Sequence, residues 1–138
     1  MSALTEFLFP APAERRFGAI LTWWEKRRLG FNLAIVGAGA FTYAYGTLIT
    51  LLPPLSEGVE YPPLEGPLTV LVVANIVYLL GPAAEAMSRR VLGADGPATG
   101  PALFRGMLTL GVGAALLPSL VMTFIWVARL VAWVLTSV

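Results

Sequence analysis

The sequence predicts an all-α membrane protein in which three transmembrane helices follow an amphipathic interfacial helix. Apolar residues make up 57% of the 138 residues and charged residues 12%, against roughly 45–50% and about 25% in soluble domains. So few polar side chains could not cover a soluble globule. Several apolar stretches also reach the roughly 20 residues that cross a bilayer. Residues 1–138 are therefore expected to form a single membrane domain.

Residues 14–30 are the predicted interfacial helix. Apolar residues recur there at intervals of three and four, and basic residues stand between them. Basic amphipathic helices with tryptophan lie at the membrane–water interface. The simpler interpretation, which we favour, is a positive anchor that leads directly into the first span. The side chains expected to contact lipid headgroups here are Trp23, Trp24, Lys26, Arg27 and Arg28.

The first two membrane spans are predicted at residues 32–52 and 67–87. Each is an apolar stretch of about 20 residues, long enough to cross the hydrocarbon core. Pro53 and Pro54 end the first stretch. Pro82 lies inside the second and is expected to bend its last turns, because proline removes a helical hydrogen bond.

The last apolar region, residues 103–138, is too long for one ordinary span and slightly short for two. Arg105 and Arg129 are separated by about 36 Å along a helix axis, close to the thickness of a bilayer. Both arginines would then lie at headgroup level on opposite surfaces. We therefore predict one span at 105–129 with an apolar C-terminal extension at 130–138. A four-pass arrangement is the alternative.

The distribution of positive charge predicts the orientation of the chain. Eight of the nine Lys and Arg residues lie before the first span or in the stretch from the end of the second span to Arg105, where the third begins. The loop between the first two spans has no basic residue and carries Glu57, Glu60 and Glu65. Because basic residues are retained in the cytoplasm, the N-terminus is expected inside and the C-terminus outside.

The segment WWEKRRLGFN, residues 23–32, runs straight into the first span. It resembles a leader found in small bacterial multi-pass membrane proteins to which no activity has been assigned. The resemblance covers about ten residues. It implies a membrane protein of bacterial origin. Together with the charge distribution, this predicts an inner (cytoplasmic) membrane location with a periplasmic C-terminus. It implies no function.

Several classes of chemistry are excluded by composition. Cysteine and histidine are both absent, which removes disulfides, thiolate metal sites and imidazole bases. Ser119 stands in an apolar stretch without a base to activate it, so no catalytic residue and no enzymatic activity are expected. No metal or cofactor of its own is expected either, only bound lipids or adjacent pigments held by partner subunits. A net charge of +1 gives no reason to expect nucleic-acid binding.

Small residues four positions apart predict where helices approach closely. Such pairs let two backbones come together and gain dispersion contacts. The pattern leaves open whether the contact is made within the chain or with another subunit. The residues concerned are Ala34, Ala38, Ala40, Ala44, Gly111 and Ala115.

Polar residues of the second span share one helical face, which includes Asn75, Tyr78 and Glu85. Glu85 has Arg89 four residues later, a spacing that favours a helical ion pair. A structural clasp is therefore preferred over a proton-carrying site. Asn75 lies near the middle of the bilayer and is expected to find a partner across a helix interface.

A second interfacial group is expected at the outer surface. Trp126, Arg129 and Trp133 are spaced three and four residues apart near the end of the third span. Tryptophan and arginine in such positions are typical of the aromatic belt at headgroup level. They are expected to anchor the helix in lipid.

These features favour a non-catalytic accessory or structural subunit of a larger membrane complex, for example a respiratory or photosynthetic one. Its partners would be membrane lipids and other integral membrane subunits. The alternative is a small transporter or channel made of several copies, in which the face with Asn75 and Glu85 would line the pathway.

Overall fold

The computed structural model describes residues 3–14, 16–54, 65–93 and 97–137. These residues form four helices and, within the described ranges, no strand. The helices are α1 (Ala3–Leu8), α2 (Phe17–Thr50), α3 (Glu65–Leu92) and α4 (Gly100–Ser137). The last three are each long and apolar enough to cross a membrane. The predicted all-α fold with three membrane-spanning helices is thus confirmed, and the chain is a multi-pass membrane protein.

The expected interfacial helix at 14–30 is not a separate element. Residues 17–30 form the first turns of α2, which continues without a break into the first span. A lone glycine such as Gly30 costs a helix only about 1 kcal/mol, so nothing in the local sequence forces a break there. The stretch that precedes Pro10 contains the short helix α1.

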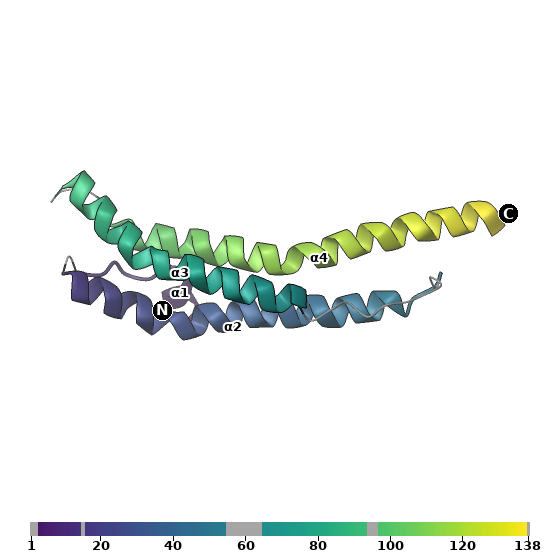
Figure 1. The fold of residues 1–138 in the computed structure, drawn as a ribbon, viewed down its shortest axis with the longest axis horizontal. Coiled ribbons are helices and arrows are strands. Elements are labelled where there is room, and N and C mark those ends of the chain that lie inside the picture. Colours follow the sequence, from purple (N-terminus) through teal and green to yellow (C-terminus); the bar gives the residue numbers. More distant parts are fainter. Residues whose placement is uncertain (1–2, 15, 55–64, 94–96, 138) are drawn as a thin grey trace.

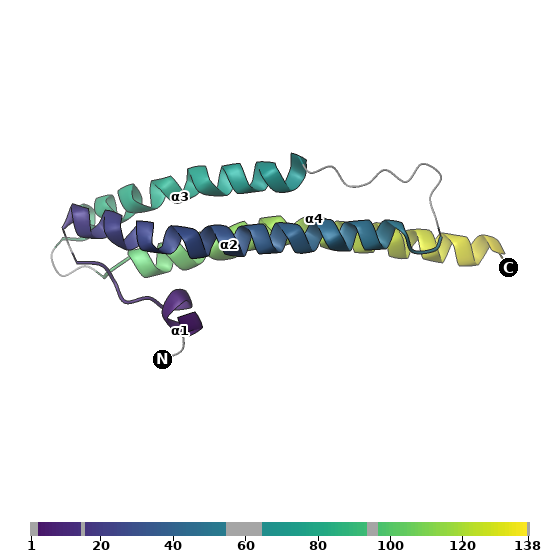
Figure 2. The same cartoon turned by 90° about the horizontal axis from the view of Figure 1, so that it is seen from below.

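The three long helices form one elongated bundle (Figure 1). α2 and α4 run side by side in the same direction, and α3 runs antiparallel to them. In Figure 2, α1 and α3 lie on opposite sides of the α2–α4 pair. α2 begins, α3 ends and α4 begins at the same end of the bundle (Figure 1). We call this the basic end, after its side chains Arg16, Lys26, Arg27, Arg28, Arg89, Arg90 and Arg105.

α4 is the longest helix and extends past the end of α2 (Figure 1). The indole N–H of Trp126 donates a hydrogen bond of 3.1 Å to the carbonyl of Pro53, which places the end of α2 beside Trp126. The remaining turns of α4 project beyond this point. Pro118 lies within α4, yet the helix is continuous through it. One helix therefore occupies the region for which two spans were the alternative.

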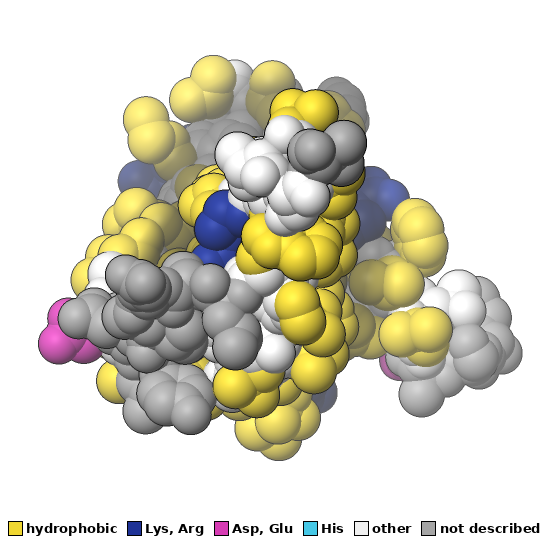
Figure 3. All heavy atoms as spheres, turned by 90° about the vertical axis from the view of Figure 1, so that its right-hand side faces the viewer, with side chains coloured by type: hydrophobic (Ala, Val, Ile, Leu, Met, Phe, Trp, Pro, Cys, Tyr) yellow, Lys and Arg dark blue, Asp and Glu magenta, His cyan; other side chains and the backbone are white. Residues whose placement is uncertain are grey.

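The packed core lies towards the basic end. Trp24, Phe31, Tyr78 and Phe104 are all buried there. Most other large apolar side chains are exposed; Leu110, for example, is 75% exposed. Viewed from the end at which α4 terminates, hydrophobic side chains gather on the outside of the bundle (Figure 3). Soluble proteins do not expose continuous apolar surfaces of this extent, whereas lipid contact requires them.

Candidate functional site

Glu85 of α3 is a charged side chain in the interior of the bundle. It is completely buried, and each of its carboxylate oxygens has a donor. Oε2 accepts a hydrogen bond of 2.8 Å from the indole N–H of Trp24, and Oε1 forms an ion pair with Arg89. A buried charge is tolerated only when it is paired and hydrogen-bonded. The arrangement meets this condition. We call Glu85, its partners Trp24 and Arg89, and Tyr78, which packs on Trp24, the clasp.

The clasp reaches the N-terminal segment and the start of α4. The guanidinium of Arg89 also donates a hydrogen bond of 3.0 Å to the carbonyl of Ala13. A Cβ atom at Gly100 would run into the carboxylate of Glu85. The carboxylate therefore lies against the first turn of α4, where the helix carries partial positive charge. One side chain of α3 thus connects α2, α4 and the chain before α2.

Aromatic packing holds the clasp in place. The indole of Trp24 lies edge-on to the ring of Tyr78, with ring centroids 5.2 Å apart. The hydroxyl of Tyr78 donates a hydrogen bond of 2.5 Å to the backbone carbonyl of Trp24. Gly81 leaves room for the indole, since a Cβ there would lie 2.5 Å from the ring of Trp24. Sequence analysis missed Gly81 and Gly100. Gly81 lies on the same helical face as Tyr78 and Glu85, and that spacing could have indicated it.

Asn75 lies where α3 packs on α2. Its side-chain amide donates hydrogen bonds of 2.9 Å to the side-chain oxygen of Asn32 and to the carbonyl of Leu71. Asn32 was not among the predicted site residues. The polar face of α3 is therefore turned towards α2 along its length, from Asn75 to Glu85.

Hydroxyl groups join α2 to α4 on either side of Pro118. Thr42 donates a hydrogen bond of 2.7 Å to the carbonyl of Ala115. Thr123 donates its one hydroxyl proton to the carbonyl of Ser119. The hydroxyl of Tyr45, 2.7 Å away, must therefore donate to Thr123. These bonds hold the proline-containing part of α4 against its neighbour.

The small residues fall into two groups. Gly111 and Ala115 face α2: a Cβ at Gly111 would lie 2.6 Å from the side chain of Ile35, and Ala115 is buried. Ala34 and Ala38 are partly buried. In contrast, Ala40 and Ala44 are exposed, so no described helix covers them.

Two of the tryptophans expected to contact lipid lie inside the bundle instead. Trp23 and Trp24 are both buried rather than exposed to headgroups. Their rings fill the contact between α2 and its neighbours. Their indole N–H groups find partners within the protein, for Trp23 the carbonyl of Ala11 at 2.6 Å. The expectation that they contact lipid headgroups is therefore wrong.

The remaining interfacial residues are at least partly accessible. Arg28 pairs with Glu25 at 3.2 Å. Lys26 and Trp133 are exposed, whereas Trp126 and Arg129 are half-buried beside the end of α2. Arg27 stacks on the ring of Trp23, 4.0 Å from its centroid.

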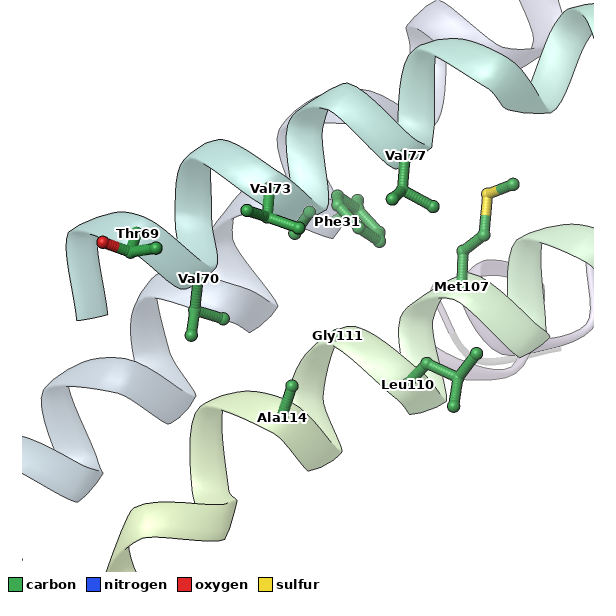
Figure 4. Close-up of a pocket in the computed structure, with 10 residues that line it drawn as sticks. Phe31, Thr69, Val70, Val73, Val77, Met107, Leu110, Gly111 and Ala114 are labelled. Atoms are coloured by element: carbon green, nitrogen blue, oxygen red, sulfur yellow. The ribbon is translucent and has the colours of Figure 1, made fainter. Parts of the chain in front are cut away.

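An apolar groove of about 320 Å³ lies between α3 and α4. In Figure 4, Val70, Val73 and Val77 form one wall, Met107 and Leu110 face them, and the other side chains complete the lining. Of the lining residues, Thr69 alone is polar, and none is charged. A conduction pathway for ions needs polar groups to replace water, so this groove does not provide one.

The described residues include no group of three or more acidic side chains that could hold a metal ion. In comparisons with protein-family models, with curated proteins and with solved structures, nothing matches this chain.

Proposed function

We propose that this protein is a non-catalytic accessory subunit of a larger membrane complex, for example a respiratory or photosynthetic one. One observation carries the proposal: the polar groups of the bundle interior bind one another, while a small-residue face of α2 is turned outward. The polar groups stabilise the subunit itself. The outward face is suited to packing against a helix of a second protein.

The interior polar groups leave little capacity for chemistry. Both oxygens of Glu85 are occupied, and Asn75 is bound to Asn32 and to a backbone carbonyl. A proton carrier or a substrate-binding residue needs a polar group that has no protein partner and that faces a cavity. These side chains instead act as links between helices.

The outward face of α2 contains Gly37, Ala40 and Ala44, spaced three and four residues apart. All three are exposed, and a Cβ at Gly37 would meet nothing within 4 Å. Small residues at this spacing allow another helix to approach closely in lipid. In this chain no other described helix does so, which supports contact with a helix of a partner subunit.

The proposed orientation places the basic end in the cytoplasm of a bacterial cell, with the C-terminus in the periplasm. Residues 130–137 of α4 then continue beyond Arg129, at the outer surface. Residues 130–135 are apolar, and most of the segment is exposed; a helical end of this kind is stabilised when a protein covers it. The protein would hold no cofactor of its own, and pigments, where present, would belong to partner subunits.

The test is co-purification from native membranes in a mild detergent. We expect integral membrane subunits to accompany the wild-type protein. The double variant Ala40→Ile, Ala44→Ile should lose them while keeping its helical content and thermal stability. Ala128→Ile makes the same change at an exposed position of α4 and should keep the partners. Recovery of the wild-type protein alone and monomeric would rule out the proposal.

The alternative, a homo-oligomeric transporter or channel, needs the face with Asn75, Tyr78 and Glu85 to line a pathway between copies. That face is turned towards α2 and bonded there, which favours the accessory role. A liposome flux assay separates the two. A flux abolished by Asn75→Leu and Glu85→Gln in correctly folded protein would favour transport.

A further inference from the structure

A polar hollow lies between α1 and the first turns of α2. Glu6, Phe7, Lys26 and Arg27 line it, and its volume is about 290 Å³. It therefore brings two cationic side chains and one carboxylate to the same open depression. The clasp is separate from it, since none of the clasp residues lines this hollow.

The charged groups of this hollow form no close ion pair with a described residue, although Glu6 lies near enough to Arg27 for an electrostatic attraction. Neither Glu6 nor Lys26 has a side-chain hydrogen bond or ion pair to any described residue. Arg27 is held in place by its stack on Trp23 and by a hydrogen bond of 2.9 Å to the carbonyl of the same residue. Its Nε is shielded from solvent but has no partner. The guanidinium is thus fixed beside the hollow, and its charge forms no ion pair with a described residue.

The hollow lies at the level expected for lipid headgroups. Phe7 packs edge-on against Phe104, with ring centroids 5.4 Å apart, and thereby fixes α1 against the bundle at the basic end. Leu4 and Phe9, which flank Phe7 in the sequence, are 67% and 61% exposed. These apolar side chains favour burial in lipid, which would bring the hollow to the membrane surface.

We infer that this hollow binds the zwitterionic headgroup of phosphatidylethanolamine, with the phosphate at Lys26 and Arg27 and the ammonium at Glu6. Phosphate oxygens are acceptors that match the guanidinium and ammonium donors. The primary ammonium of the headgroup donates hydrogen bonds that the Glu6 carboxylate accepts. The headgroup of phosphatidylglycerol ends in uncharged hydroxyls, so it would lack the charge–charge attraction to Glu6. The quaternary ammonium of phosphatidylcholine has no N–H to donate.

The test measures binding of short-chain phosphatidylethanolamine, phosphatidylglycerol and phosphatidylcholine to the full-length protein in detergent by native mass spectrometry. We expect phosphatidylethanolamine to bind about three- to fivefold more tightly than either of the others, the range of one exposed ion pair. Soluble glycerophosphoethanolamine, which lacks acyl chains, should bind much more weakly. Equal affinity for this soluble compound would overturn the assignment to a lipid.

Two variants locate the site. Glu6→Gln should abolish the preference for phosphatidylethanolamine over phosphatidylglycerol, and Lys26→Gln should weaken the binding of both lipids. The matched control is Glu14→Gln, an exposed acidic residue of the same segment that does not line the hollow. Equal binding of the three lipids to the wild-type protein, or an unchanged preference in Glu6→Gln, would overturn the inference. Neither result bears on the accessory role, which co-purification tests independently.

Discussion

The carboxylate of Glu85 accepts a hydrogen bond of 2.8 Å from the indole N–H of Trp24, a residue 61 positions earlier in the chain. This bond joins α3 to α2 at the basic end. The ion pair of the same carboxylate with Arg89 extends the link to the N-terminal segment through Ala13. Glu85 therefore links α3 to α2 directly and to the N-terminal segment through Arg89.

Glu85→Gln should destabilise the bundle by about 3–5 kcal/mol, the cost of breaking a buried ion pair from one side. Glutamine can still accept the Trp24 hydrogen bond, but Arg89, whose side chain is 13% exposed, loses its counter-charge. Reversible unfolding in mixed micelles measures the change. Glu25→Gln breaks an exposed pair with Arg28 and should cost less than about 1 kcal/mol. Equal effects of the two changes would contradict the clasp.

Gly81→Ala should also destabilise the protein, because the added Cβ would lie 2.5 Å from the ring of Trp24. Overpacking of this kind typically costs about 1–3 kcal/mol. Gly113→Ala is the matched change at a helical glycine whose Cβ would meet nothing within 4 Å. It should be stabilising by about 0.5–1 kcal/mol, because alanine favours the helix. Thermal unfolding of the two variants in the same detergent compares them directly, and a stabilised Gly81→Ala would refute the packing described.

Asn32 and Asn75 should show a coupling energy in a double-mutant cycle. Hydrogen bonds between membrane helices are worth about 0.6 kcal/mol on average and up to about 1.7 kcal/mol. The cycle uses Asn32→Leu, Asn75→Leu and the double variant, with unfolding free energy as the readout. Strict additivity of the two single changes would show that the 2.9 Å contact contributes nothing.

Local patterns in the sequence predicted the three long helices and the ion pair of Glu85 with Arg89. Both depend on spacings within one helix, which an amino-acid sequence contains directly. Trp24 could not be assigned to Glu85 in the same way, because a tryptophan near basic residues suits an interface as well as a core. The burial of Trp24 depends on Gly81, which lies on another helix, and on how the two helices align.

The partner of Asn75 was missed for the same reason. A polar residue in an apolar stretch indicates that a partner is needed, but it does not show which residue on which helix provides it. Asn32 follows only from the antiparallel alignment of α2 with α3. The separation of the small residues into inward-facing Ala115 and outward-facing Ala44 likewise depends on the packing of the whole bundle.

Site-directed labelling from the two sides of the membrane tests the central claim most directly. The chain has no cysteine, so Ala11→Cys, Ala98→Cys and Ser137→Cys each introduce a single thiol. An impermeant maleimide is applied to intact cells and to inverted vesicles. Three spans predict that positions 11 and 98 react from one side only, which the proposed orientation makes the cytoplasmic side. Position 137 should react only from the outside. Labelling of positions 11 and 137 from the same side would contradict a bundle that crosses the membrane three times.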